Sequence, residues 1–515
     1  MSMCESGLRL LALLLCCALL PAPARAQQPA LTSADSALVG RILLAEDQRD
    51  VSNPALAEGA RHPDQRIQLL ARRATARIGD PKFASRDSFP KLPAPPAYQD
   101  PAWRLRYRAL TPSDCLALRG ALADSVWAVR LHAIDLVSAT CAHDSLWTRA
   151  LITWVRTVPP NASRLHATAS WQPAAHALVA LARTRPEIGR RMLPVIARKH
   201  TAALRVYAAR TAAILNDTSA LRTLARDPDD NVMEAAIDGL SKVAGHSADD
   251  IYLLTLSARG YQAVRAAARA LAGSSRKGEV LNAALAAERR LRNDSSETSR
   301  DARLALLERV SEQADPAHAM AIAALATDFD CAVAQAAATI AARLAPTSGM
   351  APKCTRLPVR LSPDAVALAL GRDARLRVVM ADSSGGGSFV VRLRGDVAPI
   401  MAARILELAR AHYYDGLTWQ RVETDFVIQG GSPHANEYAG NPRFIRDELG
   451  TVPHVRGAVG MSTRGHDTGD AQWFVNLRDN LRLNADYTVF GEVVEGIDIV
   501  DGVLEGDVIA RIEVL

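Results

Sequence analysis

The stretch TWQRVETDFVIQGG at residues 418–431 predicts a β-strand, a tight break and a second β-strand that ends at two glycines. An arginine, Arg421, lies inside the first strand, where β-branched and aromatic residues are the usual choice. Paired with Glu423, this arginine would be an ordinary surface residue of a strand. Whether Arg421 has a role in a functional site depends on the segments that surround it in sequence.

The residues on either side of this stretch, from 375 to 515, alternate apolar and polar side chains as β-strands do. RLRVVM and FVVRLRG, joined by the turn ADSSGGGS, predict a hairpin at 375–395 whose glycines supply positive φ angles. An amphipathic helix is predicted at 398–416, with Pro399 in its first turn and Gly416 beyond its end. The last strand, VIARIEVL, is expected to pair with the first. This order predicts a closed β-barrel capped by helices.

Residues 35–346 have a different pattern, because long Ala, Leu and Arg-rich segments place apolar residues at helical spacing. An aliphatic residue followed four positions later by alanine recurs there, usually just after a turn that contains Asp. The recurring pairs are Ile67 and Ala71, Val129 and Ala133, Leu204 and Ala208, Val232 and Ala236, Val264 and Ala268, and Val333 and Ala337. Separations of 28 and 32 residues between the clearest copies indicate a period of about 30.

Two segments of this region, HPDQRIQLLARRATARIGD at 62–80 and ARDPDDNVMEAAIDGLSKVAG at 225–245, resemble short bacterial HEAT repeats. The resemblance implies an α-solenoid over 35–346, in which each helix pair buries its apolar face against its neighbours and the concave face binds a protein partner. A non-repeating helical bundle is the alternative. The proline-containing stretch 347–374 predicts a linker with one short helix.

The composition limits the classes of function. The chain is 49% hydrophobic and 23% charged, and its formal net charge of +6 is spread without a long Lys/Arg block. This balance is too mild for nucleic-acid binding. The cysteines show no metal-ligand spacing, and we expect neither a metal nor a cofactor.

The first 26 residues predict a signal peptide. A short segment ending at Arg9 leads into the apolar run LRLLALLLCCALL at residues 8–20, and PAPARA ends in the small-x-small pattern that signal peptidases cut. An apolar run of about 13 residues is shorter than the roughly 20 that span a bilayer, which favours cleavage over an anchor. Lipid attachment at Cys16 or Cys17 is a further alternative. We expect an exported protein, periplasmic or secreted, with no membrane span after cleavage.

Four cysteines follow the predicted leader: Cys115, Cys141, Cys331 and Cys354. An even number in an oxidising compartment permits two disulfides. Pairing Cys115 with Cys141 and Cys331 with Cys354 is the simplest of the three connectivities. Buried free thiols within close-packed helices are the alternative.

Five motifs of the C-terminal region occur in an order and spacing that carry a family resemblance. They are WQRV, FVIQGG, RGAVGMS, AQWFVNL and YTVFGEVVEGIDIVD. Over residues 375–515 the sequence resembles the cyclophilin-type peptidyl-prolyl cis-trans isomerases. The resemblance implies an eight-stranded barrel closed by two helices, with a proline-containing peptide lying across its outer surface.

The same resemblance implies the residues of the site. Arg421, Gln429 and Phe474 match the catalytic set, in which the Gln429 amide helps to hold the arginine and the substrate carbonyl. Phe426, Val427, Phe474 and Leu483 match the apolar pocket for the proline ring, and Tyr487 matches its rim. Ser462 and Thr463 would offer backbone groups to the extended peptide. Since strict alternation does not bring Phe426 and Gln429 to one face, a bend or bulge is expected between them.

A physical argument explains why an arginine suits this chemistry. Rotation about an X-Pro bond passes a barrier of about 18–20 kcal/mol at which amide resonance is lost and the prolyl nitrogen regains a lone pair. A guanidinium aimed at that nitrogen donates a hydrogen bond that the planar ground state cannot accept. The group is always protonated and rigidly planar, unlike the ammonium group of lysine.

Departures from the family pattern affect inhibitor binding more than catalysis. Arg482 occupies a position that is often aromatic in cyclosporin-sensitive members, so we expect weak cyclosporin binding at most. The sequence as a whole predicts an exported isomerase that assists protein folding, with the helical repeats as a scaffold for clients or partners. The alternative is a non-catalytic scaffold or adaptor of the cell envelope that binds proline-containing peptides.

Overall fold

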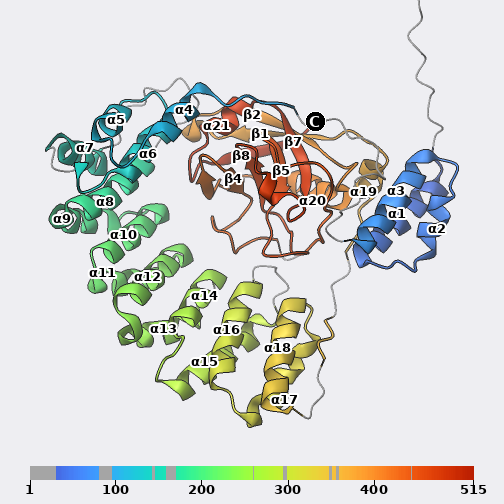
Figure 1. Cartoon of the computed structure of the whole chain (residues 1–515), viewed down its shortest axis with the longest axis horizontal. Coiled ribbons are helices and arrows are strands. Elements are labelled where there is room, and N and C mark those ends of the chain that lie inside the picture. Colours follow the sequence, from blue (N-terminus) through green and yellow to red (C-terminus); the bar gives the residue numbers. More distant parts are fainter. Residues whose placement is uncertain are drawn as a thin grey trace, which may run out of the picture.

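A computed structural model describes most of the chain, and the predicted signal peptide lies outside the described residues. The described ranges are 31–80, 96–141, 145–157, 170–258, 260–293, 299–346, 351–354, 359–441 and 444–515. An N-terminal helical region precedes an eight-stranded curled sheet formed by the C-terminal residues (Figure 1). Within the described ranges, no helix combines the length and apolar character needed to cross a membrane.

The larger part of the helical region forms an arc that curves around the sheet (Figure 1). Its α-helices are α4 (Ala102–Ala109), α5 (Cys115–Ala121), α6 (Trp127–Leu136), α7 (Ser145–Arg156), α8 (Gln172–Thr184), α9 (Pro186–Ala197), α10 (Ala202–Ile214), α11 (Thr218–Leu224), α12 (Asp230–Val243), α13 (Asp249–Thr255), α14 (Tyr261–Ala270), α15 (Lys277–Leu291), α16 (Ser299–Gln313), α17 (Ala319–Ala323) and α18 (Cys331–Leu344). From α6 to α18, each even-numbered helix packs on the next even-numbered one.

Local sequence explains where several of these helices begin. The carboxylate of Asp229 accepts hydrogen bonds from the first backbone N–H groups of α12, and Asp330 does the same for α18. Such caps satisfy donors that have no partner within the helix. All residues of the recurring aliphatic–alanine pairs are buried. The prediction of a helical region is confirmed, whereas its likeness to HEAT repeats stays a prediction.

The first three helices pack with the sheet rather than with the arc. They are α1 (Ser33–Gln48), α2 (Pro54–Ala60) and α3 (Gln65–Gly79), and their apolar side chains share one hydrophobic core with the sheet. Arg73 and Arg77 of α3 donate to the backbone carbonyls of Asp396 and Val397 at 2.8 and 3.0 Å, and both pair with buried Glu46. The predicted range 35–346 therefore contains helices of two different packing units.

The predicted linker contains α19 (Pro363–Ala369), which packs on α1 and on the sheet's own helix α20. Two disulfides lie in the helical region. Cys115 at the start of α5 is bonded to Cys141, and Cys331 at the start of α18 is bonded to Cys354, with Cα atoms 5.1 and 5.0 Å apart. Each disulfide joins cysteines that are near in sequence.

The sheet has the strand order β3-β4-β6-β5-β7-β2-β1-β8, and all of its neighbouring strands are antiparallel. Its strands are β1 (Arg375–Met380), β2 (Ser388–Leu393), β3 (Arg421–Glu423), β4 (Val427–Gly430), β5 (Ala458–Met461), β6 (Trp473–Asn476), β7 (Val489–Glu495) and β8 (Ile509–Val514). The expected pairing of the last strand with the first is confirmed.

The two edges of the curled sheet approach each other just before β3 and β8. Thr418 and Val508 form an isolated bridge, and the N–H of Trp419 donates to the carbonyl of Asp507 at 2.9 Å. The edge strands β3 and β8 share no ladder of their own. The structure thus has a curled sheet joined at this bridge, and full closure of a barrel stays a prediction.

Strands β1 and β2 pair as an antiparallel hairpin with the glycine turn that the sequence predicts. Gly385, Gly386 and Gly387 have φ angles of 93°, 68° and 84°, which only glycine adopts without strain. Helix α20 (Pro399–Arg410) ends before the predicted limit at 416. The helix ends in a turn in which His412 adopts a left-handed φ of 56° and the N–H of Tyr413 donates to the carbonyl of Leu408 at 3.0 Å. The buried Tyr414 hydroxyl then donates to the carbonyl of Ala471 at 3.0 Å. Helix α21 (Ile497–Gly502) precedes β8.

Candidate active site

A pocket of about 260 Å³ opens on the face of β4 and β6 that points away from the core. Side chains alternate along a strand, so Ile428 and Val475 enter the core while Val427 and Phe474 face the pocket. The pocket is lined by all nine residues that the resemblance implies, which are Arg421, Phe426, Val427, Gln429, Ser462, Thr463, Phe474, Leu483 and Tyr487. Glu437, Arg464 and Arg482 complete its lining.

The floor of the pocket is an apolar cluster separate from the main cores. Val427, Phe474 and Leu483 are buried in it, and Phe426 and Tyr487 pack at its edge. The Tyr487 ring meets the Phe474 ring edge to face, with centroids 5.8 Å apart. This floor offers a small aliphatic ring an apolar surface without a hydrogen-bonding demand.

A turn brings Phe426 to the same side as Gln429. Residues 424–426 connect β3 to β4, and the N–H of Phe426 donates to the carbonyl of Glu423 at 2.8 Å. Phe426 therefore precedes β4, and its side chain does not follow the alternation of side chains along that strand. The expected bend is this turn, and no bulge interrupts the register of β3 with β4.

Strand pairing places the polar side of the pocket. Arg421 of β3 is the register partner of Gln429 of β4, which in turn pairs with Phe474 of β6. The Nη1 atom of Arg421 donates to Oε1 of Gln429 at 3.3 Å, and its Nε donates to Glu423 at 2.9 Å. The Arg421 side chain is 38% exposed, and its Cζ lies 5.9 Å from the Phe426 ring centroid.

The amide of Gln429 is held from the opposite side. Its Nε2 donates to the Ser462 hydroxyl at 3.0 Å and to Oε1 of Gln472 at 3.3 Å. Because the amide nitrogen is occupied in this way, the amide oxygen faces Arg421. The N–H of Ser462 donates to the carbonyl of Gln472 at 2.9 Å. This N–H is therefore used within the sheet and is not available to pair with a bound peptide.

A buried histidine supports the floor of the pocket from behind. The His454 ring stacks on the Phe474 ring at 5.7 Å, and its Nε2 lies 3.0 Å from the Tyr487 carbonyl. Its Nδ1 lies 3.2 Å from the Asn476 amide nitrogen. A carbonyl only accepts and an NH₂ only donates, so the ring is neutral with its proton on Nε2. Burial lowers the pKa of His454 to about 4.

Charged side chains form the rim. Glu437 lies 3.1 Å from Nη1 of Arg421 and 3.2 Å from Nη2 of Arg464. The guanidinium of Arg482 stacks over the Phe426 ring at 4.6 Å. The expectation of weak cyclosporin binding stays a prediction.

The sequence analysis missed several residues of this site. Gln472 and Asn476 lie in the quoted motif AQWFVNL, so their proximity to Phe474 was a usable signal. Glu437, His454 and Arg464 lie in irregular segments and carry no local signal, because loop geometry alone brings them to the pocket. Among the described residues, no group of three or more His, Cys, Asp or Glu side chains is arranged to hold a metal.

An apolar floor beside a fixed guanidinium and a fixed amide defines a site for a proline residue in a peptide. A floor of this kind can accommodate the ring, and an arginine in this place can donate a hydrogen bond to a prolyl nitrogen that becomes pyramidal as its bond turns. The class of protein that this fold and site define is a peptidyl-prolyl isomerase.

Comparison with known proteins agrees with this assignment. Residues 377–512 match the family described as cyclophilin type peptidyl-prolyl cis-trans isomerase/CLD. The chain is 36% identical over 131 residues to peptidyl-prolyl cis-trans isomerase B of Bacillus subtilis, which covers 25% of this chain and 92% of that protein. It is 33% identical over 130 residues to a peptidyl-prolyl cis-trans isomerase of Helicobacter pylori, covering 24% of this chain and 80% of that protein. The chain belongs to the cyclophilin-type peptidyl-prolyl cis-trans isomerases through its C-terminal domain.

Proposed function

We propose that the protein accelerates folding of exported proteins by isomerising their X-Pro bonds, and that the helical arc is a surface for clients or partners. Arg421 stabilises the twisted bond, Gln429 orients the arginine and the substrate carbonyl, and Phe474 holds the proline ring. Phe426, Val427 and Leu483 enclose that ring. Tyr487 closes the rim, and Ser462 and Thr463 contribute polar groups beside the bound chain.

One observation carries the proposal for catalysis. The guanidinium of Arg421 and the apolar cluster around Phe474 line the same pocket, with Gln429 between them in register. A site that only bound proline would need the apolar floor alone. The additional donor at the rim is what the turning bond requires, because only the twisted state offers a basic prolyl nitrogen.

Export is supported by the leader-like first 26 residues and by two disulfides, which are typical of oxidising compartments. Uncatalysed prolyl isomerisation takes about 10–100 s at 25 °C. A secreted chain that waits this long exposes apolar surface to aggregation. An isomerase in the periplasm or outside the cell would shorten the wait.

A non-catalytic scaffold is the second candidate, and a specific contact favours it. Arg421 is paired with Glu423 and Glu437, so its donors are engaged before a peptide arrives. In that function the arginine would maintain the shape of the rim, and proline binding would serve assembly in the cell envelope.

Substitution of Arg421 in the full chain separates the two candidates. Arg421→Ala should lower kcat/KM for a short Ala-Pro peptide by about 100-fold, the usual effect of removing one transition-state donor. Peptide affinity should change less than about threefold, because the apolar floor remains. Arg421→Lys should be intermediate, since a point charge lacks the planar fork.

Arg511→Ala is the matched control. Arg511 lies in β8 of the same sheet and pairs with Glu513 two residues on, as Arg421 pairs with Glu423. This control should retain the wild-type rate. If wild type fails to accelerate isomerisation, the scaffold function is favoured instead. If wild type is active and Arg421→Ala is equally fast, the proposed role of Arg421 is wrong.

A further inference from the structure

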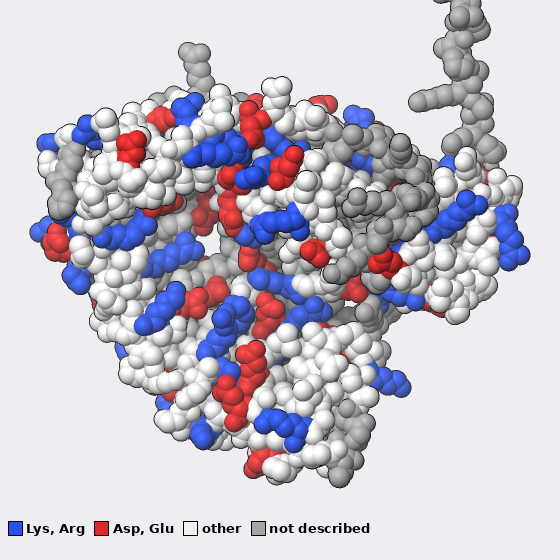
Figure 2. All heavy atoms as spheres, viewed as in Figure 1, with Lys and Arg blue, Asp and Glu red and all other residues white. Residues whose placement is uncertain are grey.

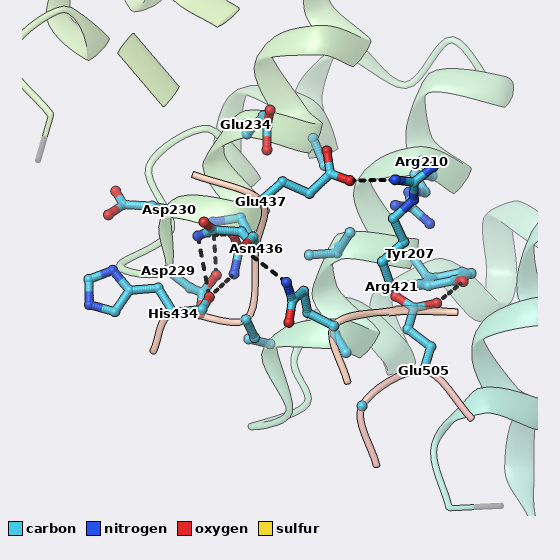
Figure 3. A pocket seen from close by; sticks show the side chains of 18 of the residues that line it. Tyr207, Arg210, Asp229, Asp230, Glu234, Arg421, His434, Asn436, Glu437 and Glu505 are labelled. Carbon is cyan, nitrogen blue, oxygen red and sulfur yellow. Dashed lines mark hydrogen bonds and ion pairs between the residues drawn. The ribbon is translucent and has the colours of Figure 1, made fainter. Parts of the chain in front are cut away.

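The active pocket adjoins a much larger hollow between the sheet and the helical arc. This hollow has a volume of about 1130 Å³ and shares Arg421 and Glu437 with the pocket. Its walls come from α10 and α12 on one side and from the loop at 433–438 on the other. Figure 3 shows labelled side chains of both parts around the same hollow. Its volume exceeds that of most small-molecule sites.

A second hollow adjoins the pocket at Phe426. Its volume is about 380 Å³, and it is lined by His132 of α6 and His176 of α8 as well as by the turn at 424–426. On another side of the pocket, Arg464 forms an ion pair with Asp301 of α16 at 3.6 Å. Arg300, also of α16, donates to the backbone carbonyl of Arg464 at 3.1 Å. Helical residues therefore face the pocket rim from three directions.

This enclosure limits the shape of a substrate. A proline on the convex surface of a folded domain would bring the rest of that domain against α6, α12 and α16. An extended chain can instead place its proline in the pocket and continue through the hollows on either side. Backbone groups of an extended segment are then available to the walls, as in other modes of peptide recognition.

The larger hollow carries a charge opposite to that of the chain. Its acidic lining residues are Asp229, Asp230, Glu234, Asp238, Glu437 and Glu505, and its basic ones are Arg210, Lys242 and Arg421. This gives six carboxylates against three cations, whereas the whole chain has a net charge of +6. Figure 2 shows acidic and basic side chains side by side where the arc meets the sheet, so the acidic excess belongs to the lining of the hollow.

The carboxylates on α12 are set to receive a cation. Glu234 is half-buried, and its pKa is raised to about 7 by burial and then by the nearby negative charge of Asp238. Arg265 and Arg464 offset part of this effect. A cationic side chain placed in the hollow would relieve the repulsion between these carboxylates.

We infer that the substrate is an extended, unfolded segment with lysine or arginine residues on one side of its proline, seated in the hollow between α12 and the loop at 433–438. The inference rests on the proposed isomerase function and names the substrate class for the same site. Glu234 and Asp238 of α12 determine the specificity.

The test measures cis-trans exchange by NMR in the full chain with matched peptides. All peptides have 16 residues and one central proline. Two of them carry three lysines, one on the N-terminal side of the proline and the other on its C-terminal side. Each lysine peptide has a counterpart with glutamates at the same three positions. A short Ala-Pro tetrapeptide without charged side chains reports the basic isomerase reaction. The variant is Glu234→Gln with Asp238→Asn, and the control is Glu187→Gln on α9, which lines neither hollow.

For wild type we expect kcat/KM to favour one lysine peptide over its glutamate counterpart by about fivefold or more, the effect of a few partly exposed ion pairs. The double variant should reduce this ratio to about twofold or less, and 0.5 M salt should reduce it likewise, since screening acts within about 10 Å at 0.1 M. The Glu187→Gln control should keep the wild-type ratio.

Equal rates for lysine and glutamate peptides in wild type, or a ratio that the double variant leaves unchanged, would overturn the inference. Failure of the isomerase function itself has a different signature, because the tetrapeptide would then not be accelerated. A double variant that misfolds would also lose the tetrapeptide rate. In that case the single variants Glu234→Gln and Asp238→Asn are measured instead. Each is expected to reduce the ratio of kcat/KM between the lysine and glutamate peptides.

Discussion

At the scale of single residues, the pocket depends on neighbours that make room for its floor. Gly460 of β5 is the register partner of Phe474, and a Cβ atom on this glycine would lie 2.4 Å from Cζ of the Phe474 ring. Such a distance is shorter than any real contact, so a side chain at 460 has to displace the ring. Because the His454 ring stacks on the Phe474 ring, we expect the displaced ring to move toward the pocket.

Gly460→Ala should therefore raise KM for Ala-Pro peptides by about tenfold and destabilise the domain by about 1 kcal/mol, as overpacking usually does. The measurements are isomerisation kinetics and urea unfolding. Gly278→Ala on α15 is the control, because nothing lies within 4 Å of its added Cβ and the site is remote. An unchanged KM in Gly460→Ala would show that the Phe474 ring does not define the proline site.

His454 makes stability depend on pH. Its pKa is about 4 in the folded state because of burial, against an ordinary value of 6.5. Between pH 6.5 and 4 the unfolded chain binds the proton and the folded chain does not, so stability falls as the pH falls through this window. Above pH 6.5 both states are neutral, and below pH 4 both are protonated. A shift of this size corresponds to about 3 kcal/mol.

The prediction is tested with His454→Gln, which keeps one donor and one acceptor but does not titrate. Between pH 7.5 and 4, wild type should lose about 3 kcal/mol of unfolding free energy relative to the variant. Urea unfolding at several pH values measures this difference. Buried carboxylates such as Glu448 and Asp507, whose pKa values are raised to about 7 mainly by burial, contribute to both proteins and cancel. A difference that does not change with pH would contradict a neutral, buried His454.

At the scale of elements, the segment 432–441, which contains the loop at 433–438, connects the arc to Arg421. Asn231 of α12 donates to the carbonyl of His434 at 2.9 Å, and its Oδ1 accepts from Asn436 at 2.9 Å and from Gln262 of α14 at 3.0 Å. The same loop carries Glu437, which contacts Arg421. The arc thus holds the loop, and through it one side of the site.

Asn231→Ala should loosen this loop. Two hydrogen bonds between α12 and the loop are lost, each worth about 0.5–1.5 kcal/mol. Amide exchange at Tyr438 and Ala439, whose N–H groups donate to Asn436, should become about 30-fold faster. Hydrogen exchange read by mass spectrometry measures it, and Gln335→Ala on α18, where the glutamine side chain contacts Thr339 of its own helix, is the control.

Kinetics distinguish a positioning role from general destabilisation. Asn231→Ala should lower kcat for the short peptide more than it raises KM, because the apolar floor is untouched while Glu437 no longer holds Arg421. If Asn231→Ala lowers stability in thermal unfolding but leaves the kinetics of each folded molecule unchanged, the loop does not act on the site.

At the scale of the whole molecule, the chain forms two cores that do not follow the order of the sequence. One core belongs to the arc, and the other joins the first three helices to the sheet across more than 300 residues of sequence. A fragment that begins at residue 371 lacks α1, α3 and α19, which cover part of that second core. To test whether the arc binds clients, substitutions in the full chain are therefore better than an isolated C-terminal fragment.

The disulfide between Cys115 and Cys141 stabilises the arc rather than the site. It closes a loop with a sequence separation of 26, which corresponds to about 3 kcal/mol in the chain-entropy description. Cys115→Ala with Cys141→Ala should lower the free energy of the arc's unfolding transition by about that amount. The tetrapeptide rate at 25 °C should stay within about twofold of wild type, since the pocket is lined only by residues 421–487.

Urea unfolding and the isomerase assay measure the two effects on the same samples. A reducing agent should reproduce the loss of stability in wild type and should have a smaller effect on the variant, in which only the bond between Cys331 and Cys354 remains. Loss of the tetrapeptide rate in parallel with the arc's stability would show that the site depends on an intact arc.

The sequence by itself determined the features that depend on near neighbours. Aspartates in the turns before α12 and α18 capped those helices, three glycines set the hairpin turn, and the spacing of Arg421 and Gln429 across a short turn made them partners in register. Each of these features depends on interactions between residues within about ten positions of each other, so the local sequence is enough to predict it. The family motifs extended this local reading to Phe474, Leu483 and Tyr487.

Only the tertiary structure decided which distant residues meet. The contact of Asn231 with Asn436 spans 205 positions, and the stacking of His454 on Phe474 depends on an irregular loop. Neither leaves a periodic signal, because the loops that form them have no repeating geometry. The acidic hollow beside Arg421 arises in the same way, since its carboxylates are ordinary surface residues until the arc curves back over the sheet.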